Sequence, residues 1–317
     1  MEKIKVDIIV PLYNEVEVFP KLIERLNNLI ERAQEDISVI LVDDGSKDNT
    51  AQMVADLCHT NKNYSGVVLS RNFGHQIALT AGINVSNSSD NVLIIDADLQ
   101  DPPELLFDML RKMEAGYDVV YGVRKNRKES RVRIFFFDMF YRVLKKIAYQ
   151  DLPLDAGDFA LLSRKVVDAL KNMPEESRYL RGMRSWVGFN QVGLEYDRSE
   201  REEGLTKYSY SKRIKLAFDG VFNFSRFPIK VITFLGTLTV LTSLIYFGHT
   251  LYKKYYLDQV EDGFTATIFL IILFGGVQLI SIGIIGEYLL RVFFQVKNRP
   301  LYLVKETYIN NSDKESS

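Results

Sequence analysis

The segment Val92-Leu-Ile-Ile-Asp-Ala-Asp-Leu-Gln-Asp-Pro-Pro103 joins a short apolar run to a cluster of carboxylates. An apolar run that ends at polar residues and prolines is typical of a buried strand followed by a loop. We therefore expect Asp96 and Asp98 at the carboxyl end of a strand. Solvated loop carboxylates are the simpler interpretation, but neighbouring negative charges repel unless a cation or a hydrogen-bond donor joins them. Hard oxygen ligands in this position are able to hold Mg²⁺ or Mn²⁺.

The same pattern repeats on both sides of this segment, because apolar runs alternate with stretches of helical spacing from residue 5 to about residue 122. The predicted strands are Val6 to Pro11, Val39 to Val42, Val67 to Leu69, Val92 to Ile95 and Val119 to Tyr121. The predicted helices are Val16 to Ala33, Asn49 to Cys58, His75 to Val85 and Pro103 to Ala115. Strict alternation predicts an α/β domain with a mostly parallel sheet covered on both faces. Ligands bind such sheets beyond the carboxyl ends of the strands.

The other predicted strands also end in polar residues. The segments are Pro11-Leu-Tyr-Asn-Glu15, Asp43-Asp-Gly-Ser46 and Ser70-Arg-Asn-Phe-Gly74. Asp43 and Asp44 give this edge of the sheet a second carboxylate pair, although Asp-Asp-Gly-Ser is equally typical of a turn before a helix cap. His75 is interpreted as a residue that caps or packs the helix it begins.

Composition removes several classes of function. The 317 residues carry 40 Lys and Arg against 41 Asp and Glu, so net charge gives no reason to expect a nucleic-acid partner. Neither the dinucleotide-binding glycine pattern after the first strand nor a P-loop pattern occurs. One cysteine and three histidines supply neither an intramolecular disulfide nor a zinc cluster.

Two stretches near the C-terminus, Val231 to Tyr252 and Phe264 to Gly286, contain no charged side chain. A helix of about 20 residues crosses a bilayer core of about 30 Å, so both stretches are long enough to span a membrane. Buried core helices are the alternative, but fully apolar helices of this length are rare in soluble domains. Lys and Arg flank the outer ends of the pair, which predicts a multi-pass protein of the cell (inner) membrane with both termini cytoplasmic.

These observations predict four parts of the chain. They are an α/β domain over 1–209, an interfacial amphipathic helix over 210–228, a two-span hairpin over 229–294 with spans at about 231–252 and 264–288, and a cytoplasmic polar tail over 295–317. Basic and aromatic residues over 124–146 and 211–227 are typical of helices that lie in a membrane interface, with core packing of the phenylalanines as the alternative. Glycines 275, 276, 283 and 286 allow close helix packing and favour a homo-oligomer.

The four ordered blocks resemble the inverting family 2 glycosyltransferases. They read Pro-Leu-Tyr-Asn-Glu, Val-Asp-Asp-Gly-Ser, Ser-Arg-Asn-Phe-Gly-His-Gln and Asp-Ala-Asp-Leu-Gln-Asp-Pro-Pro-Glu. Within that family they are similar to the branch that contains dolichol-phosphate mannose synthase and the bactoprenol glucosyltransferases. The resemblance continues through Asp155 to Arg164, Tyr179 to Gly182, Arg201 to Tyr208 and the hairpin. It implies a GT-A fold for the α/β domain.

The resemblance also implies roles for individual residues. Nucleotide-sugar contacts fall on Pro11, Tyr13, Glu15, Asp43, Asp44, Asp96, Ala97 and Arg124. Metal contacts fall on Asp96, Asp98 and Gln100, and contacts to the phosphate or lipid acceptor on Arg201, Lys207 and Arg131. Asp98 and Asp158 match acidic positions at the reacting centre, where Asp158 either orients groups or takes a proton.

The function implied is inverting, metal-dependent transfer of a sugar from a nucleotide sugar to a polyprenyl phosphate. UDP-glucose and undecaprenyl phosphate are the expected substrates, with Mg²⁺ or Mn²⁺ as cofactor and cell-envelope glycan modification as the purpose. One alternative is an enzyme like dolichyl-phosphate mannose synthase that uses GDP-mannose. Others are a processive polysaccharide synthase, which is expected to carry more spans, and a non-enzymatic nucleotide-binding subunit of a membrane transporter.

Overall fold

The computed structural model describes residues 3–87, 89–125, 156–176, 178–197, 227–256 and 263–308. The chain forms two compact units. One comprises Met1–Tyr141, Gln150–Lys207 and Arg299–Ser317, and the other Arg142–Tyr149 and Tyr208–Asn298. The predicted interfacial segments lie almost entirely outside the described residues.

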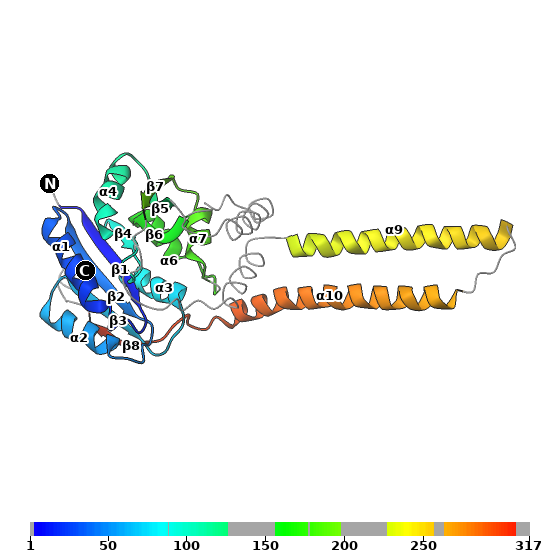
Figure 1. Cartoon of the computed structure of the whole chain (residues 1–317), viewed down its shortest axis with the longest axis horizontal. Helices are drawn as coiled ribbons and strands as arrows, with labels where there is room; N and C mark the ends of the chain where they lie inside the picture. The colour runs from blue at the N-terminus through cyan, green and yellow to red at the C-terminus, as the bar shows by residue number, and fades with distance from the viewer. Residues whose placement is uncertain are drawn as a thin grey trace. The chain divides into compact units, whose positions relative to one another are not determined.

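The first unit is built on an eight-stranded sheet with the order β7-β5-β6-β4-β1-β2-β3-β8 (Figure 1). The strands are β1 (Lys5–Leu12), β2 (Asp36–Asp43), β3 (Tyr64–Leu69), β4 (Asn91–Ile94), β5 (Val119–Lys125), β6 (Ala156–Ser163), β7 (Gln191–Asp197) and β8 (Val304–Tyr308). Strands β1 to β4 pair in parallel, as do β5 and β7, whereas β6 runs antiparallel to both β4 and β5. The prediction of a mostly parallel α/β sheet is confirmed.

Helices cover both faces of this sheet, which explains why its central strands are apolar throughout. The helices are α1 (Phe19–Arg32), α2 (Thr50–Thr60), α3 (His75–Val85), a 3-10 turn at Pro103–Leu105 that leads into α4 (Leu106–Glu114), α6 (Arg164–Lys171) and α7 (Leu180–Trp186). Side chains of β1 alternate between two cores: Ile8 and Val10 pack with α1, α2 and α4, and Ile9 packs with α3, α6 and α7. A Cβ on Gly82 of α3 would lie 2.4 Å from Ile9 Cγ2, so glycine there lets the helix approach the sheet.

The C-terminal segment corrects one prediction. We expected a polar tail over 295–317, but Val304–Tyr308 forms β8, which pairs antiparallel with β3. The Ser70 amide donates to the Leu303 carbonyl, and the Tyr308 ring packs edge-on against His59. The strand is short, charged and largely exposed, as an edge strand commonly is, so its sequence lacks the apolar run that identified the central strands.

The second unit contains two long helices, α9 (Phe227–Tyr256) and α10 (Phe264–Lys297), which contact each other and run antiparallel (Figure 1). Candidate membrane spans by length and composition are Val231–His249 and Leu273–Lys297. Many of their large apolar side chains are exposed in this unit. The orientation of the termini stays a prediction.

Candidate active site

Carboxylates gather at one edge of the sheet because of strand direction. Asp43 ends β2 and Asp96 follows β4, and both strands are parallel to β1. Strand β6 runs the other way, with Ala160 opposite Ile94, so Asp158 near its start lies at this same edge. A single antiparallel strand therefore brings Asp158 beside the loop after β4.

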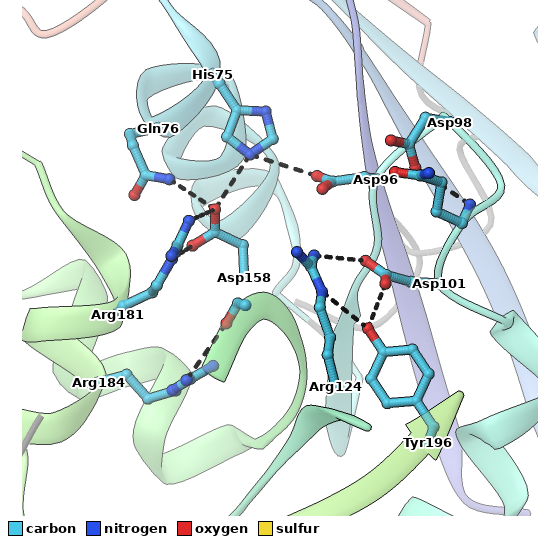
Figure 2. A network of polar contacts seen from close by, with 12 residues as sticks. His75, Gln76, Asp96, Asp98, Asp101, Arg124, Asp158, Arg181, Arg184 and Tyr196 are labelled. Carbon is cyan, nitrogen blue, oxygen red and sulfur yellow. Dashed lines mark hydrogen bonds and ion pairs between the residues drawn. The ribbon is translucent and has the colours of Figure 1, made fainter. Parts of the chain in front are cut away.

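Asp158 is a buried carboxylate held by donors from two helices (Figure 2). Arg181 of α7 donates twice, from Nε to Oδ1 at 2.9 Å and from Nη2 to Oδ2 at 3.2 Å. Gln76 Nε2 of α3 donates to Oδ2 at 3.1 Å, and His75 Nε2 lies 3.4 Å from the same oxygen. Burial alone raises the pKa of Asp158, but Arg181 and His75 outweigh it and hold that pKa far below its usual range. Asp158 is therefore ionised at neutral pH.

His75 connects Asp158 to the loop after β4. Its Nε2 lies 3.5 Å from Asp96 Oδ1. Burial disfavours the imidazolium, but the hydrogen bond to Asp158 and the charges of Asp96 and Asp158 raise the pKa of His75 to about 9. For Asp96, burial together with neighbouring carboxylates raises the pKa to about 6. The interpretation of His75 as a capping or packing residue is incomplete, because its ring joins two carboxylates of the site.

A second arginine of α7 places more positive charge near Asp158. Arg184 is only 4% exposed, and its guanidinium lies over the Tyr121 ring at 5.2 Å. Its Nε has no hydrogen-bond partner among the described residues. Burial lowers the pKa of Arg184 to about 10, which leaves it charged at neutral pH. The charges of Arg181 and Arg184 together favour an anion at this end of the sheet.

Arg124 is held from the opposite side of the site by Asp101 and Tyr196 (Figure 2). Its Nη2 lies 3.6 Å from Asp101 Oδ2, and its Nε donates to the Tyr196 hydroxyl at 3.4 Å. The Tyr196 hydroxyl in turn donates to Asp101 Oδ1. A Cβ on Gly157 would lie 3.2 Å from Arg124 Nη2, so glycine there leaves room for the guanidinium. Arg124 is thus oriented at the edge of the sheet that also carries Asp96.

The loop after β4 offers oxygen ligands of the kind that Mg²⁺ and Mn²⁺ prefer. Asp96 Oδ1 is buried and accepts no hydrogen bond from any described residue, while Asp98 Oδ1 accepts a bond from the Gln100 amide at 3.2 Å. No group of three His, Cys, Asp or Glu side chains able to hold a metal occurs in the described part of the chain. Asp96 and Asp98 could therefore supply part of the oxygen ligands of such a cation, but not a complete set.

The carboxylates after β2 differ from each other in their contacts. Asp44 accepts hydrogen bonds from the amides of Phe73 at 2.7 Å and Gly74 at 2.9 Å, so it joins two loops. Asp43 Oδ2 accepts from the Ser46 amide at 3.0 Å, but its Oδ1 is buried without a hydrogen-bond partner among the described residues. The local turn contact is thus made by Asp43, which keeps its second oxygen as an acceptor, whereas Asp44 bonds to the loop after β3. Burial raises the pKa of both carboxyls.

The structure describes some of the remaining predicted site residues and does not describe the others. Pro11 and Ala97 are buried, and Tyr13, Glu15 and Gln100 are half-buried. Arg131, Arg201 and Lys207 lie outside the described residues. The sequence interpretation assigned no role to Gln76, Asp101, Arg181 and Tyr196. Of these, only Tyr196 lies outside the blocks that carry the resemblance.

The loop after β2 depends on Gly45, which gives a stability prediction. Its φ is +64°, and a Cβ there would lie 2.2 Å from the Arg71 carbonyl carbon. We expect Gly45→Ala to lower the free energy of unfolding by about 3 kcal/mol. Two costs add: an alanine is strained at this positive φ, and its Cβ clashes with the backbone of Arg71. Gly116→Ala is the matched control, since φ is +94° but no atom lies within 4 Å of its Cβ. Thermal unfolding of the purified proteins measures the difference, and equal Tm losses would contradict the clash.

Comparison with known proteins identifies the domain. The model of the family described as "Glycosyl transferase family 2" matches residues 7–171. An uncharacterized glycosyltransferase of Synechocystis, sll0501, is 42% identical over 96% of both chains. The uncharacterized glycosyltransferase YkcC of Bacillus subtilis is 40% identical over 96% of this chain and 94% of its own. A prophage-derived bactoprenol glucosyl transferase of Shigella flexneri is 34% identical over 97% of this chain and 99% of its own. The chain therefore belongs to glycosyltransferase family 2 and is a glycosyltransferase.

Proposed function

We propose that this enzyme transfers glucose from UDP-glucose to undecaprenyl phosphate, with inversion at the anomeric carbon, at the cytoplasmic face of the cell membrane. The observation that carries the proposal is the ionised Asp158 beside the loop of Asp96 and Asp98, in a chain that continues into two candidate spans. The relative named bactoprenol glucosyl transferase, which covers nearly the whole chain, supports both the lipid acceptor and the sugar.

The charges suit a single displacement. An acceptor phosphate oxygen attacks the anomeric carbon, the bond from that carbon to the β-phosphate oxygen breaks, and UDP leaves with the bonding electrons. A phosphate monoester has a second pKa near ~6, so the acceptor is largely ionised at neutral pH and needs no strong base. Because Asp158 has a depressed pKa, it is a poor proton acceptor. Its role in this proposal is to face positive charge at the anomeric carbon.

The leaving diphosphate requires the opposite charge. Arg124, oriented by Asp101 and Tyr196, supplies a guanidinium that suits phosphate oxygens. A divalent cation held by Asp96 and Asp98, with Gln100 as a further proposed ligand, would supply electrostatic stabilisation of the departing diphosphate. Asp43 is positioned for the nucleoside, because one of its oxygens still has acceptor capacity.

The test uses membranes that contain the full-length protein, undecaprenyl phosphate and a panel of radiolabelled nucleotide sugars. We expect label in the lipid fraction with UDP-glucose and at most trace label with GDP-mannose. Arg124→Gln should reduce labelling about a hundredfold, since a charged hydrogen bond to the leaving group is lost. Arg111→Gln is the matched control, because the Arg111 side chain is 74% exposed on α4 and pairs with Asp108 in the contacts described. Absence of label with every donor would contradict the function, and label from GDP-mannose alone would favour the mannose alternative.

A further inference from the structure

The Gln76 side chain joins three elements of the site through both ends of its carboxamide, and Figure 2 shows the contact of its nitrogen with Asp158. Gln76 is the second residue of α3. Its Nε2 donates to Asp158 Oδ2 on β6 at 3.1 Å, and its Oε1 accepts from the Leu180 amide on α7 at 2.8 Å. The contacts connect residues 82 and 104 positions apart in the chain. A carboxamide makes this bridge without adding charge, because one end donates and the other accepts.

The second contact fixes the start of α7. Leu180 is the first residue of that helix, and the N-cap residue Tyr179 makes no side-chain capping bond. First-turn amides have no acceptor within their own helix, so an acceptor from elsewhere stabilises the helix start. Gln76 supplies it. The next residue, Arg181, makes the bidentate pair with Asp158. A shift of α7 would therefore move the guanidinium that holds the carboxylate.

We propose that Gln76 is a positioning residue for Asp158. It holds the carboxylate directly, and through the Leu180 amide it fixes the start of α7 and so the position of Arg181. This inference rests on the proposed function, because it assigns Asp158 to the reacting centre. Gln76 acts on the reaction only through these two neighbours.

Other contacts keep α7 attached when Gln76 is replaced. Leu180 and Met183 are 5% and 2% exposed and pack in the core beneath α3. Arg178, just before α7, donates to Thr80 Oγ1 of α3 at 3.3 Å and to the Met173 carbonyl at 2.6 Å. Removal of the Gln76 carboxamide should thus displace Asp158 and Arg181 locally and leave the domain folded.

Three variants of the full-length protein in membranes separate the two contacts. Gln76→Leu removes both. Gln76→Glu keeps an acceptor for the Leu180 amide, but it loses the donor to Asp158 and adds a like charge. Gln52→Leu is the matched control, because Gln52 is exposed on α2 and donates only to Asp56 in the contacts described, at 2.8 Å. The readouts are kcat and KM for UDP-glucose at saturating undecaprenyl phosphate, and hydrogen exchange of the peptide that contains Leu180.

We expect kcat to fall about tenfold to a hundredfold in both Gln76 variants, with KM for UDP-glucose within about threefold of wild type, because a small misplacement at the reacting centre affects the transition state most. Exchange at the start of α7 should rise in Gln76→Leu and stay near wild type in Gln76→Glu. Gln52→Leu should match wild type in every readout.

An unchanged kcat in Gln76→Leu, or a rise in KM alone, would overturn the positioning role while the proposed function stands. Unchanged exchange in Gln76→Leu would overturn the bridge to α7. If the wild type labels no lipid with any nucleotide sugar, the proposed function has failed and this assignment fails with it. The exchange results then separate that failure from an absent bridge, because they need no substrate.

Discussion

Asp158→Asn is expected to lower kcat about a thousandfold and to leave KM for the nucleotide sugar within a few-fold of wild type. The substitution keeps the shape of the side chain but removes the negative charge at the reacting centre, and removal of one preorganised charge commonly costs 10²- to 10³-fold. Donor affinity changes little because the residues proposed to bind the nucleotide lie on other strands and loops. Initial rates of lipid labelling at varied UDP-glucose measure both constants.

The matched control is Asp168→Asn. Asp168 also lies near an arginine, with 3.5 Å between its Oδ1 and Arg164 Nη1, but it is 55% exposed on α6, where ion pairs contribute little. Loss of the buried carboxylate removes a partner of Arg181 and of His75 and destabilises the fold, so Asp158→Glu is the second variant, which keeps the charge and displaces it by one methylene. If the Asp158→Asn protein folds and keeps more than about a tenth of the wild-type kcat, Asp158 does not act at the reacting centre, because loss of one preorganised charge there costs far more than about tenfold.

The same carboxylate gives a pH dependence with a defined sign. Because the folded-state pKa of Asp158 is depressed, its ionisation stabilises the native protein above the unfolded-state pKa of about 3.9, and this contribution is lost as pH falls toward the folded-state pKa. The Tm difference between wild type and Asp158→Asn should be largest near pH 7 and shrink below about pH 4. A difference independent of pH would show that packing, rather than charge, causes the destabilisation.

The first five strands and Asp96 and Asp98 could be predicted because their signals are local. A β-branched run marks a buried strand, and the polar residues directly after it mark the edge that binds ligands. The role of Asp158 at the reacting centre was predicted only from the family resemblance. Its strand, β6, inserts antiparallel between β4 and β5, and no pattern within 156–163 specifies that pairing.

The contacts around Asp158 and Arg124 are harder to predict because they join distant residues. Arg181 is 23 residues from Asp158, and Tyr196 is 95 residues from Asp101. Arg181 lies in a helix and Tyr196 in a strand, and the sequence around each is fully explained by the formation of that element. Charges that compensate one another across a fold are therefore visible only once the sheet order is known. The strand β8 was missed because its short, charged sequence lacks an apolar run.

Chelation of divalent cations is expected to abolish transfer by the wild type, and Mg²⁺ or Mn²⁺ is expected to restore it. Asp98→Asn should lower activity about a hundredfold to a thousandfold at saturating metal, because one of two carboxylate ligands becomes neutral. Asp108→Asn is the control, since this half-buried residue of α4 pairs only with Arg111 among the contacts described. Lipid labelling after treatment with EDTA, followed by titration with each metal, gives the activity readout.

Metal binding can be measured without turnover. The described residues form no group of three ligand side chains at the loop, so Mn²⁺ should bind weakly to the protein alone and more tightly when UDP supplies diphosphate oxygens. Electron paramagnetic resonance measures the concentration of free Mn²⁺ and so gives the affinity of the protein for Mn²⁺ with and without UDP. UDP should raise this affinity strongly in wild type and should have no effect on it in Asp98→Asn. Equal Mn²⁺ affinity with and without UDP would show that the protein alone completes the coordination. Full activity in the absence of any divalent cation would leave Arg124 and the arginines of α7 as the positive charges available to the departing diphosphate, and Asp98 would then be a loop residue rather than a ligand.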